Sequence, residues 1–468
     1  MADARLNALN PYLCGLYAPV REEISASDLA VIGEIPRSLN GAYFRNGPNP
    51  MAPPAGLHHW FDGDGMLHGV WFENGRARYA NRYVRTADFE AEIEGLDAMP
   101  GIFSPARALE GRRTVYKDTA NTDIVVHNGR LLALWYISGQ PVAVDLNTLE
   151  TIGVEDFGGK LPGNVSAHSK VDPETGEFVF FDYALYEPKM SFGVVSADNR
   201  LTHFQEISLP GPRLPHDMGL TRNYVILHDL PVVFTDSAIR NRMWQIHVAD
   251  QPTRFGVVPR RSQQPGGGAP TWFEFPTCYI YHVINCWEEG DDVVMAACKM
   301  VPNGFAPDPS AYGPYAAMVT VLALRAQPFI WRMNMKTGKG TETQLDDALS
   351  EFPVVNLDYA AKKSRWSYHV VMDDHVLQRF SALRKYDLQT GRFEQHDFAP
   401  GVFASEPAFA PDSAGEDEGF VVTFTADLDG NSEAQIIDAR DFSKPPVARV
   451  KLPQRVPAGF HGTWAKAV

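Results

Sequence analysis

Cysteine is scarce in this sequence: Cys14, Cys278, Cys286 and Cys298 are the four present among 468 residues. No two of them have C-x-x-C spacing, and four cysteines are too few to crosslink a chain of this length. A disulfide scaffold is therefore excluded. The pattern is typical of buried thiols in a reducing cytoplasm.

Positive charge is also in short supply. The formal net charge is -15, with 42 Lys and Arg against 57 Asp and Glu, and this excess of negative charge repels a phosphate backbone. No stripe of lysine and arginine interleaved with aromatic residues offsets it locally. We therefore exclude nucleic acid as a partner.

Long hydrophobic runs are missing. The most apolar stretch, residues 316–324, is far shorter than the ~20 residues that span a bilayer. We expect it in the core, with peripheral contact at a membrane surface as the alternative. The first residues run into polar positions and a proline rather than into a basic and then an apolar segment, so we expect no secretory signal and a cytoplasmic location.

Long helical periodicity is scarce, whereas short β-like runs recur between turn residues. Residues 69–72 precede Asn74-Gly75, and residues 131–135 follow Asn128-Gly129. A related turn signature ends in Thr-Gly at residues 175–176, 337–338 and 390–391. Recurrence of this kind in all-β sequence indicates radial repetition, because a propeller blade buries its faces only against neighbouring blades.

No shift in composition and no charged linker divides the chain. We therefore predict an all-β fold, with residues 1–468 forming a single β-propeller domain that loops and short helices cap on one face. The candidate capping loops, chosen for their proline and glycine content, are residues 212–234, 253–268 and 302–314.

Fourteen histidines are present, and histidine is the commonest metal ligand in proteins. Those that lie in or beside short apolar or strand-like runs are His168, His216, His282 and His461. Such positions suit the inner ends of successive blades, so we predict that His461 returns from the tail and completes a metal site with the other three. Zinc motifs use close local pairs, and these four residues are scattered, so spacing alone leaves ordinary hydrogen-bonded histidines as the alternative.

Two other patterns suggest metal ligands. Residues 62–65, with Asp62 and Asp64, look like a calcium loop but lack the downstream ligand series, so we expect a tight turn beneath the metal face. His58 and His59 are adjacent, and neighbouring residues on a strand point to opposite faces. For this pair we expect a loop in solvent.

Seven short motifs together resemble the carotenoid cleavage oxygenase family, and the similarity runs over nearly the whole chain. They are residues 44–49 (FRNGPN), 61–66 (FDGDGM), 120–122 (ANT), 282–288 (HVINCWE), 351–353 (EFP), 405–407 (SEP) and 460–462 (FHG). The resemblance implies a seven-bladed β-propeller with Fe(II) on its axis, held by the four histidines, and dioxygen as co-substrate. Imidazole ligands also suit zinc and copper, so iron is implied by the resemblance and not by the ligand set.

The resemblance also implies that glutamates orient the metal ligands, because a ligating imidazole needs a partner on its other ring nitrogen. Glu351 and Glu406 match two of them. The third glutamate is expected directly after the strand at residues 131–134, where this sequence has Trp135-Tyr136. We therefore expect Tyr136 to replace a carboxylate and to leave one histidine with a neutral partner or water.

The substrate pocket follows from the same resemblance. Stilbenoid-cleaving branches of the family handle a phenol with a tyrosine and a lysine, and here those positions are Phe103 and Trp135. An apolar lining suits an apocarotenoid-like alkene better, because burying an unpaired phenol costs ~1–3 kcal/mol, although Tyr136 is able to replace the lost phenol partner. Thr122 is expected to crowd the open metal position. Phe61 and Phe305 are expected to line the cavity, with ordinary core aromatics as the alternative.

The resemblance implies a non-haem Fe(II) dioxygenase that cleaves one C=C bond of a small apolar conjugated alkene into two carbonyl products, with no catalytic side chain beyond the metal centre. The alternatives are a stilbenoid- or phenylpropene-cleaving dioxygenase and a retinoid-type isomerase on the same iron site. A propeller that serves only as a binding scaffold is a further alternative. The bond that is cleaved and the oligomeric state do not follow from the sequence.

Overall fold

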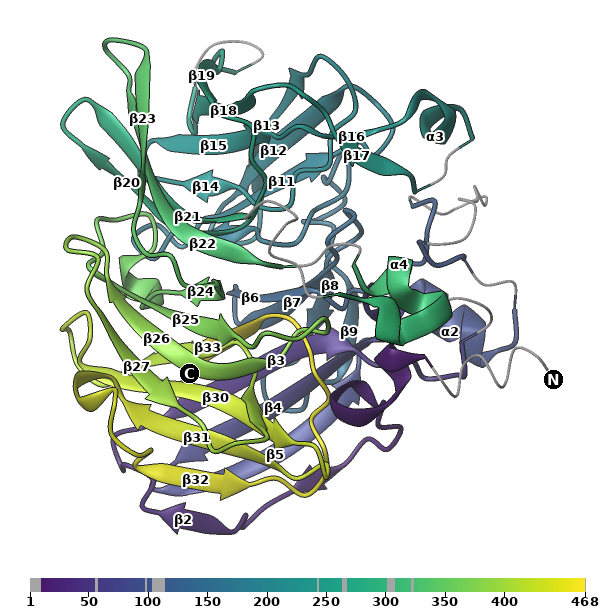
Figure 1. Cartoon of the computed structure of the whole chain (residues 1–468), viewed down its shortest axis with the longest axis vertical. Helices are drawn as coiled ribbons and strands as arrows, with labels where there is room; N and C mark the ends of the chain where they lie inside the picture. Colours follow the sequence, from purple (N-terminus) through teal and green to yellow (C-terminus); the bar gives the residue numbers. More distant parts are fainter. Residues whose placement is uncertain are drawn as a thin grey trace.

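The structure is a computed structural model that describes residues 10–54, 58–96, 99–102, 114–241, 244–262, 267–300, 308–320 and 324–467. Within these residues, seven antiparallel sheets of four to six strands form the blades of a β-propeller, and an eighth sheet has two strands. The predicted all-β, seven-bladed architecture is confirmed. Figure 1 shows the sheets arranged in chain order from purple to yellow.

The blades have the following strands. The first contains β1 (Ser25–Ala26), β3 (Gly41–Pro48), β4 (Gly65–Glu73), β5 (Arg76–Tyr83) and β33 (Gly462–Lys466). The second contains β6 (Asp123–His127), β7 (Arg130–Leu134), β8 (Val142–Val144) and β9 (Thr151–Val154). The third contains β10 (Lys170–Val171), β11 (Phe178–Tyr183), β12 (Lys189–Val195) and β13 (Leu201–Ser208).

The fourth blade contains β14 (Gly219–Leu220), β15 (Tyr224–Asp229), β18 (Thr253–Pro259) and β19 (Thr271–Phe275), and the two-stranded sheet β16 (Val232–Phe234) and β17 (Ile246–Val248) is inserted in it. The fifth contains β20 (Ile280–Glu289), β21 (Asp292–Met300), β22 (Ala326–Asn334) and β23 (Lys339–Gln344). The sixth contains β24 (Ser350–Val354), β25 (Trp366–Met372), β26 (Phe380–Asp387) and β27 (Phe393–Asp397). The seventh contains β2 (Val31–Gly33), β28 (Val402–Ala404), β29 (Ala408–Pro411), β30 (Gly419–Asp427), β31 (Ser432–Asp438) and β32 (Ala448–Lys451).

Both ends of the chain close the ring. The last strand, β33, pairs antiparallel with β3, so that Trp464 lies opposite Tyr43, and the early strand β2 pairs with β32 in the seventh blade. Gly41 opens β3 at a φ of +145°, where a Cβ atom would lie 2.4 Å from the carbonyl oxygen of Ala465. Only glycine fits this junction.

Several turns follow directly from the sequence. Asn74 and Gly75 both have positive φ between β4 and β5, as Asn128 and Gly129 do between β6 and β7, and this is the backbone that two-residue hairpin turns require. The sequence has another Asn-Gly signal, Asn40-Gly41, which predicts a hairpin-type turn before the strand-like residues 42–45. The strand β3 is present, but it pairs with β4 and β33 rather than with β2, so the predicted hairpin is wrong.

Two of the three expected capping loops are wrong in part. Residues 212–234 contain β14, β15 and β16, and residues 253–268 begin with β18, because runs rich in valine form strands despite the neighbouring proline and glycine. Residues 302–307 of the third loop lie outside the described residues.

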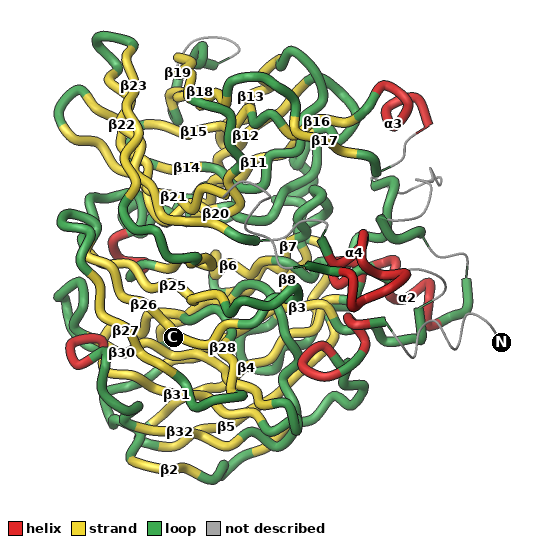
Figure 2. Tube along the Cα trace, viewed as in Figure 1, coloured by secondary structure: helices red, strands yellow, loops and turns green. Residues whose placement is uncertain are grey.

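The helices are short. They are α2 (Ala87–Ile93), α3 (Asp236–Asn241) and α4 (Ala316–Val319), with the 3-10 turns η1 (Pro11–Leu13), η2 (Gly15–Tyr17), η3 (Trp60–Asp62), η5 (Ser310–Tyr315), η6 (Leu357–Tyr359) and η7 (Ala439–Asp441). Figure 2 shows α2, α3 and α4 along one side of the molecule. Among the described residues no helix is long and apolar enough to cross a membrane.

Two predictions about exposure fail. Cys14 is exposed, while the other three cysteines are buried. His58 and His59 are buried rather than in solvent, with 5% and 1% of their surface exposed, because the Nδ1 atom of His59 caps η3 by accepting the backbone N–H of Phe61 at 3.1 Å. At residues 62–65, η3 ends at Asp62, the chain bends at Gly63 and β4 begins at Gly65. Asp64 pairs with Lys117 at 2.7 Å.

Candidate metal centre

Four imidazoles from four blades meet at the start of the innermost strands. His168 precedes β10, His216 precedes β14, His282 lies in β20 and His461 precedes β33, and all four are buried. The ring centroid of His168 lies 4.7 Å from that of His216, 4.9 Å from that of His282 and 4.5 Å from that of His461. The predicted convergence of four scattered histidines is thus present in the fold.

The backbone around His168 is held in an unusual conformation. Its φ is +66°, which is rare for a residue other than glycine. The backbone N–H of His168 donates to Oδ2 of Asp123 at 2.8 Å, and the preceding Ala167 N–H donates to the carbonyl of Trp135 at 3.0 Å. These bonds to the neighbouring blade hold the ring toward the axis.

Two of the histidines bind carboxylates through Nδ1. Nδ1 of His282 lies 2.5 Å from Oε2 of Glu351, and Nδ1 of His461 lies 3.0 Å from Oε1 of Glu406. Both carboxylates are buried and also accept a backbone N–H, Glu351 from Phe352 and Glu406 from Gly462. Each pair leaves the Nε2 atom of its histidine for a metal.

Tyr136 occupies the position at which the family resemblance implies a third glutamate. Its ring lies 6.2 Å from the His216 ring, and its buried hydroxyl has no hydrogen-bond partner among the described residues. Asp123 is an acidic residue near another of the four histidines, with Oδ2 at 3.8 Å from Nδ1 of His168. The sequence analysis missed Asp123, although it directly follows the motif at residues 120–122.

Three of the four imidazoles have lowered pKa values, which favour the neutral form. Burial, together with the neighbouring imidazoles, lowers the pKa of His168 and His282 far below the ordinary value, and burial lowers the pKa of His216 to about 3. Burial acts in the same direction on His461, but the charge of Glu406 outweighs it and raises the pKa of His461. Neutral imidazoles are the form that binds metal.

The nitrogen atoms fit a shared ion. Nε2 of His168 and Nε2 of His216 face each other at 3.1 Å, and Nε2 of His282 is buried with no hydrogen-bond partner among the described residues. Ligand atoms of His168, His216 and His282 lie within 4.8 Å of one another. A metal ion between these atoms would accept the nitrogen lone pairs, including that of His282 Nε2, which the described residues leave unpaired. A set of imidazoles suits iron, zinc or copper.

A small aromatic cavity touches the cluster on one side. The residues that line it are Phe61, Thr122, Tyr136, His216, His282, Leu324, Phe352, Phe460 and His461. The Thr122 hydroxyl donates to Asn121 and accepts the N–H of Tyr136, so its hydrogen-bonding capacity is used within the protein. This cavity is lined by three of the residues that the sequence predicts for a substrate pocket.

The other residues predicted for the substrate pocket are Trp135, Phe103 and Phe305. Trp135 is buried next to Tyr136, with ring centroids 6.1 Å apart, but lines a separate cleft with Tyr116 and Tyr183 instead of the aromatic cavity. Phe103 and Phe305 lie outside the described residues.

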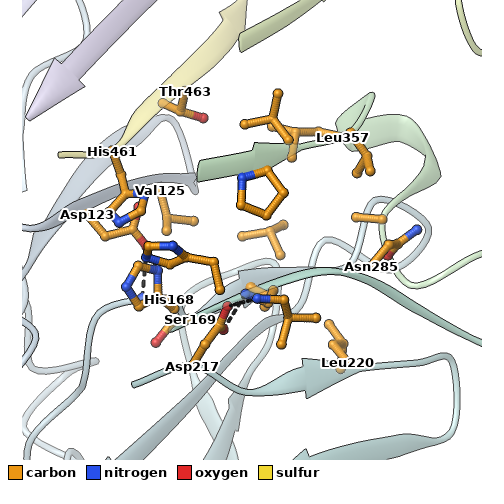
Figure 3. Close-up of a pocket in the computed structure, with 18 of the residues that line it drawn as sticks. Asp123, Val125, His168, Ser169, Asp217, Leu220, Asn285, Leu357, His461 and Thr463 are labelled. Carbon is orange, nitrogen blue, oxygen red and sulfur yellow. Dashed lines mark hydrogen bonds and ion pairs between the residues drawn. The ribbon is translucent and has the colours of Figure 1, made fainter. Parts of the chain in front are cut away.

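A second, larger cavity approaches the cluster from another direction (Figure 3). Its volume is about 280 Å³, and it follows strands β6, β10, β14, β20, β24 and β33. His168, His282 and His461 line its inner end together with Asp123 and Asp217. The histidine cluster therefore lies between two cavities of different character.

Comparison with known proteins identifies relatives over the full length of the chain. Residues 17–466 match the family model described as retinal pigment epithelial membrane protein. The carotenoid 9,10(9',10')-cleavage dioxygenase of Crocus sativus is 34% identical, over 96% of this chain and 88% of the relative. The isoeugenol monooxygenase of Pseudomonas nitroreducens is 31% identical, over 98% and 99%.

A solved structure has the same architecture. The crystal structure of the Pseudomonas brassicacearum lignostilbene dioxygenase superposes with a TM-score of 0.86 at 27% identity, over 98% of both chains.

Proposed function

Because the chain belongs to the carotenoid cleavage oxygenase family and is an alkene-cleaving dioxygenase of that type, we propose that it holds Fe(II) on His168, His216, His282 and His461 and cleaves an apocarotenoid-like alkene. The observation that carries the proposal is the convergence of four buried imidazoles, with Nε2 of His168 and His216 only 3.1 Å apart. Bound iron would supply dioxygen activation, so that both oxygen atoms add to one C=C bond and two carbonyl products leave.

The protein side chains orient the ligands. Glu351 and Glu406 accept from Nδ1 of His282 and His461, and this fixes the tautomer in which Nε2 has a free lone pair. Asp123 performs a related task for His168 through the backbone N–H. None of these groups is required to transfer a proton to the alkene.

The aromatic cavity supports an apolar, conjugated substrate. Phe61, Phe352 and Phe460 line it, and its described lining residues include no acidic or basic side chain other than the histidines. Flat rings of this kind pack well against a conjugated chain and exclude water. The cavity is small, so an alkene has to displace the side chains that close it.

A phenolic alkene is the second candidate. The unpaired hydroxyl of Tyr136 lies beside the same cavity and can bond an oxygen on the substrate, and two of the relatives are named for isoeugenol and lignostilbene. The apolar lining favours the apocarotenoid, because a phenol beyond the reach of Tyr136 remains unpaired at a cost of ~1–3 kcal/mol.

The test is incubation of iron-loaded protein with a panel of apocarotenals, stilbenes and phenylpropenes under ¹⁸O₂, with the products identified by mass. We expect two labelled carbonyl fragments from an apocarotenal and no products without oxygen. If as much product forms under anaerobic conditions, the proposed dioxygenase activity is wrong. Isomerised product without oxygen uptake would instead indicate the retinoid-type isomerase.

A further inference from the structure

We propose that the larger cavity along the propeller axis is the route by which the metal ion reaches the four histidines, with Asp123 as the first ligand that the ion meets. This inference rests on the proposed metal centre. It concerns how the ion arrives there, and it assigns a role to side chains that the alkene does not touch.

The two cavities differ in size by more than an order of magnitude. The axial cavity has about 280 Å³ of space, and the aromatic cavity about 10 Å³. Since a single water needs ~10–15 Å³ of such space, an ion can move through the axial cavity with part of its hydration shell. On the aromatic side it would have to lose that shell first, and the removal of a charge from water is costly.

The two cavities also differ in charge. Among the described residues, Asp123, Asp217, Asp358 and Glu406 line the axial cavity, and Lys170 is the lysine that lines it. Lys170 is paired with Oδ1 of Asp217 at 2.7 Å, and Lys466 is paired with Oδ2 of Asp358 at 2.6 Å. The negative charge that remains to attract a divalent cation comes from Asp123 and Glu406. Among the described residues that line the aromatic cavity, none is acidic or basic apart from the histidines.

Asp123 is placed to receive the ion. Ligand atoms of Asp123, His168 and His461 lie within 4.8 Å of one another, and the Asp123 side chain keeps 13% of its surface exposed. Figure 3 shows these three residues together at one end of the cavity and Leu357 at the other. One carboxylate and two imidazoles therefore form a first group of ligands. His282, which also lines the cavity, and His216, which does not, complete the site.

The outer end of the cavity opens at η6. Leu357 has 51% of its surface exposed, and Ala360 at the end of the same turn is half-buried. Both line the cavity. A change at either position alters the mouth while leaving every proposed metal ligand untouched.

The experiment measures uptake of Co²⁺ by the metal-free protein in a stopped-flow instrument, with the visible absorption of bound cobalt as the signal. Ala360→Trp narrows the mouth, and we expect it to slow both uptake and chelator-driven release at least tenfold while the dissociation constant stays the same. Ala360→Ser is the matched control and should load like the unchanged protein. A damaged site would lower the affinity instead of slowing both rates equally.

Two substitutions of opposite charge at the exposed position 357 provide an independent test of the route. We expect Leu357→Arg to slow uptake and Leu357→Glu to accelerate it, each about threefold or more at low salt, with the difference vanishing at high ionic strength. Asp123→Asn, whose amide oxygen is still able to accept the backbone N–H of His168, should slow uptake, and an unchanged rate would contradict the role of Asp123 as the first ligand.

Equal loading rates for the unchanged protein, Ala360→Trp and both Leu357 variants would overturn the route and leave the metal centre intact. Failure of the unchanged protein to bind cobalt at all would overturn the metal centre, and the route with it.

Discussion

Nδ1 of His461 lies 3.0 Å from Oε1 of Glu406, although 55 residues separate them in the sequence. The other oxygen of the same carboxylate accepts the backbone N–H of Gly462. One glutamate thus holds both the ring and the backbone of the ligand that comes from the tail, and β33 fixes that tail against β3.

The first prediction concerns this carboxylate. Glu406→Gln keeps the shape of the side chain but removes its charge, so we expect iron affinity to fall 10- to 100-fold, the range typical for partners of metal ligands. Competition with a chelator measures the change. Glu416→Gln is the control. The Glu416 carboxylate also accepts backbone N–H groups, from Arg365 and Trp366, and this variant should bind iron normally. Equal affinity in the two variants would show that Glu406 does not support the ligand.

A second prediction concerns Tyr136. Its hydroxyl is buried without a partner among the described residues, and a buried unsatisfied polar group costs ~1–3 kcal/mol. We therefore expect Tyr136→Phe to raise the free energy of unfolding by ~1 kcal/mol, measured by urea denaturation of the metal-free protein.

Tyr183→Phe is the matched control for that substitution. The Tyr183 hydroxyl donates to the carbonyl oxygen of Tyr136 at 2.6 Å, so its removal should lower stability by ~1 kcal/mol. A loss of stability in both variants would mean that the Tyr136 hydroxyl has a partner after all.

The third prediction concerns the junction between the third and fourth blades. Arg260 is fully buried and binds Asp172 at 2.6 Å and Glu177 at 2.5 Å. Arg260→Met leaves a buried carboxylate without its counter-charge, and we expect a loss of ~3–5 kcal/mol in the free energy of unfolding.

Arg261 offers a control on the same carboxylate. It also contacts Glu177, but its side chain has 48% of its surface exposed, so Arg261→Met should cost less than ~1 kcal/mol. Similar losses in the two variants would contradict the role assigned to burial.

The fourth prediction is a pH dependence. Burial lowers the pKa of His228 and of His369 to about 3, whereas the unfolded chain binds these protons below about pH 6.5. Unfolding then takes up protons, so stability is present above pH ~6.5 and falls as the pH decreases toward 3, by up to ~1.4 kcal/mol per pH unit for each histidine.

His228→Phe tests this dependence directly. The ring of His228 packs against Phe255 and neither nitrogen has a hydrogen-bond partner among the described residues. Urea denaturation of the metal-free protein between pH 4.5 and 7 should show a shallower loss of stability in this variant. An unchanged slope would mean that His228 does not titrate on unfolding.

The sequence allowed the convergence of the four histidines to be predicted, because the motifs that carry the family resemblance are intact. The motif at residues 460–462 identified His461, and the motifs at 351–353 and 405–407 identified the two glutamates now found at Nδ1 of His282 and His461. The hairpin turns at Asn74-Gly75 and Asn128-Gly129 followed from local chemistry alone, because they need positive φ.

What could not be predicted depends on contacts between distant segments. Asp123 looks like an ordinary residue at the start of a strand, and only the fold brings it within 3.8 Å of the His168 ring. Burial of His59 follows from the 3-10 turn that it caps. The axial cavity is shaped by six blades at once, so no single stretch of sequence reveals it.

The most direct test of the central claim is X-ray absorption spectroscopy on the iron-loaded protein, combined with metal analysis. Four imidazole nitrogens around one iron per chain is the predicted result, with loss of one nitrogen or of the iron itself in His461→Ala. Iron coordinated without the nitrogen from His461, or bound equally well after that substitution, would contradict the account.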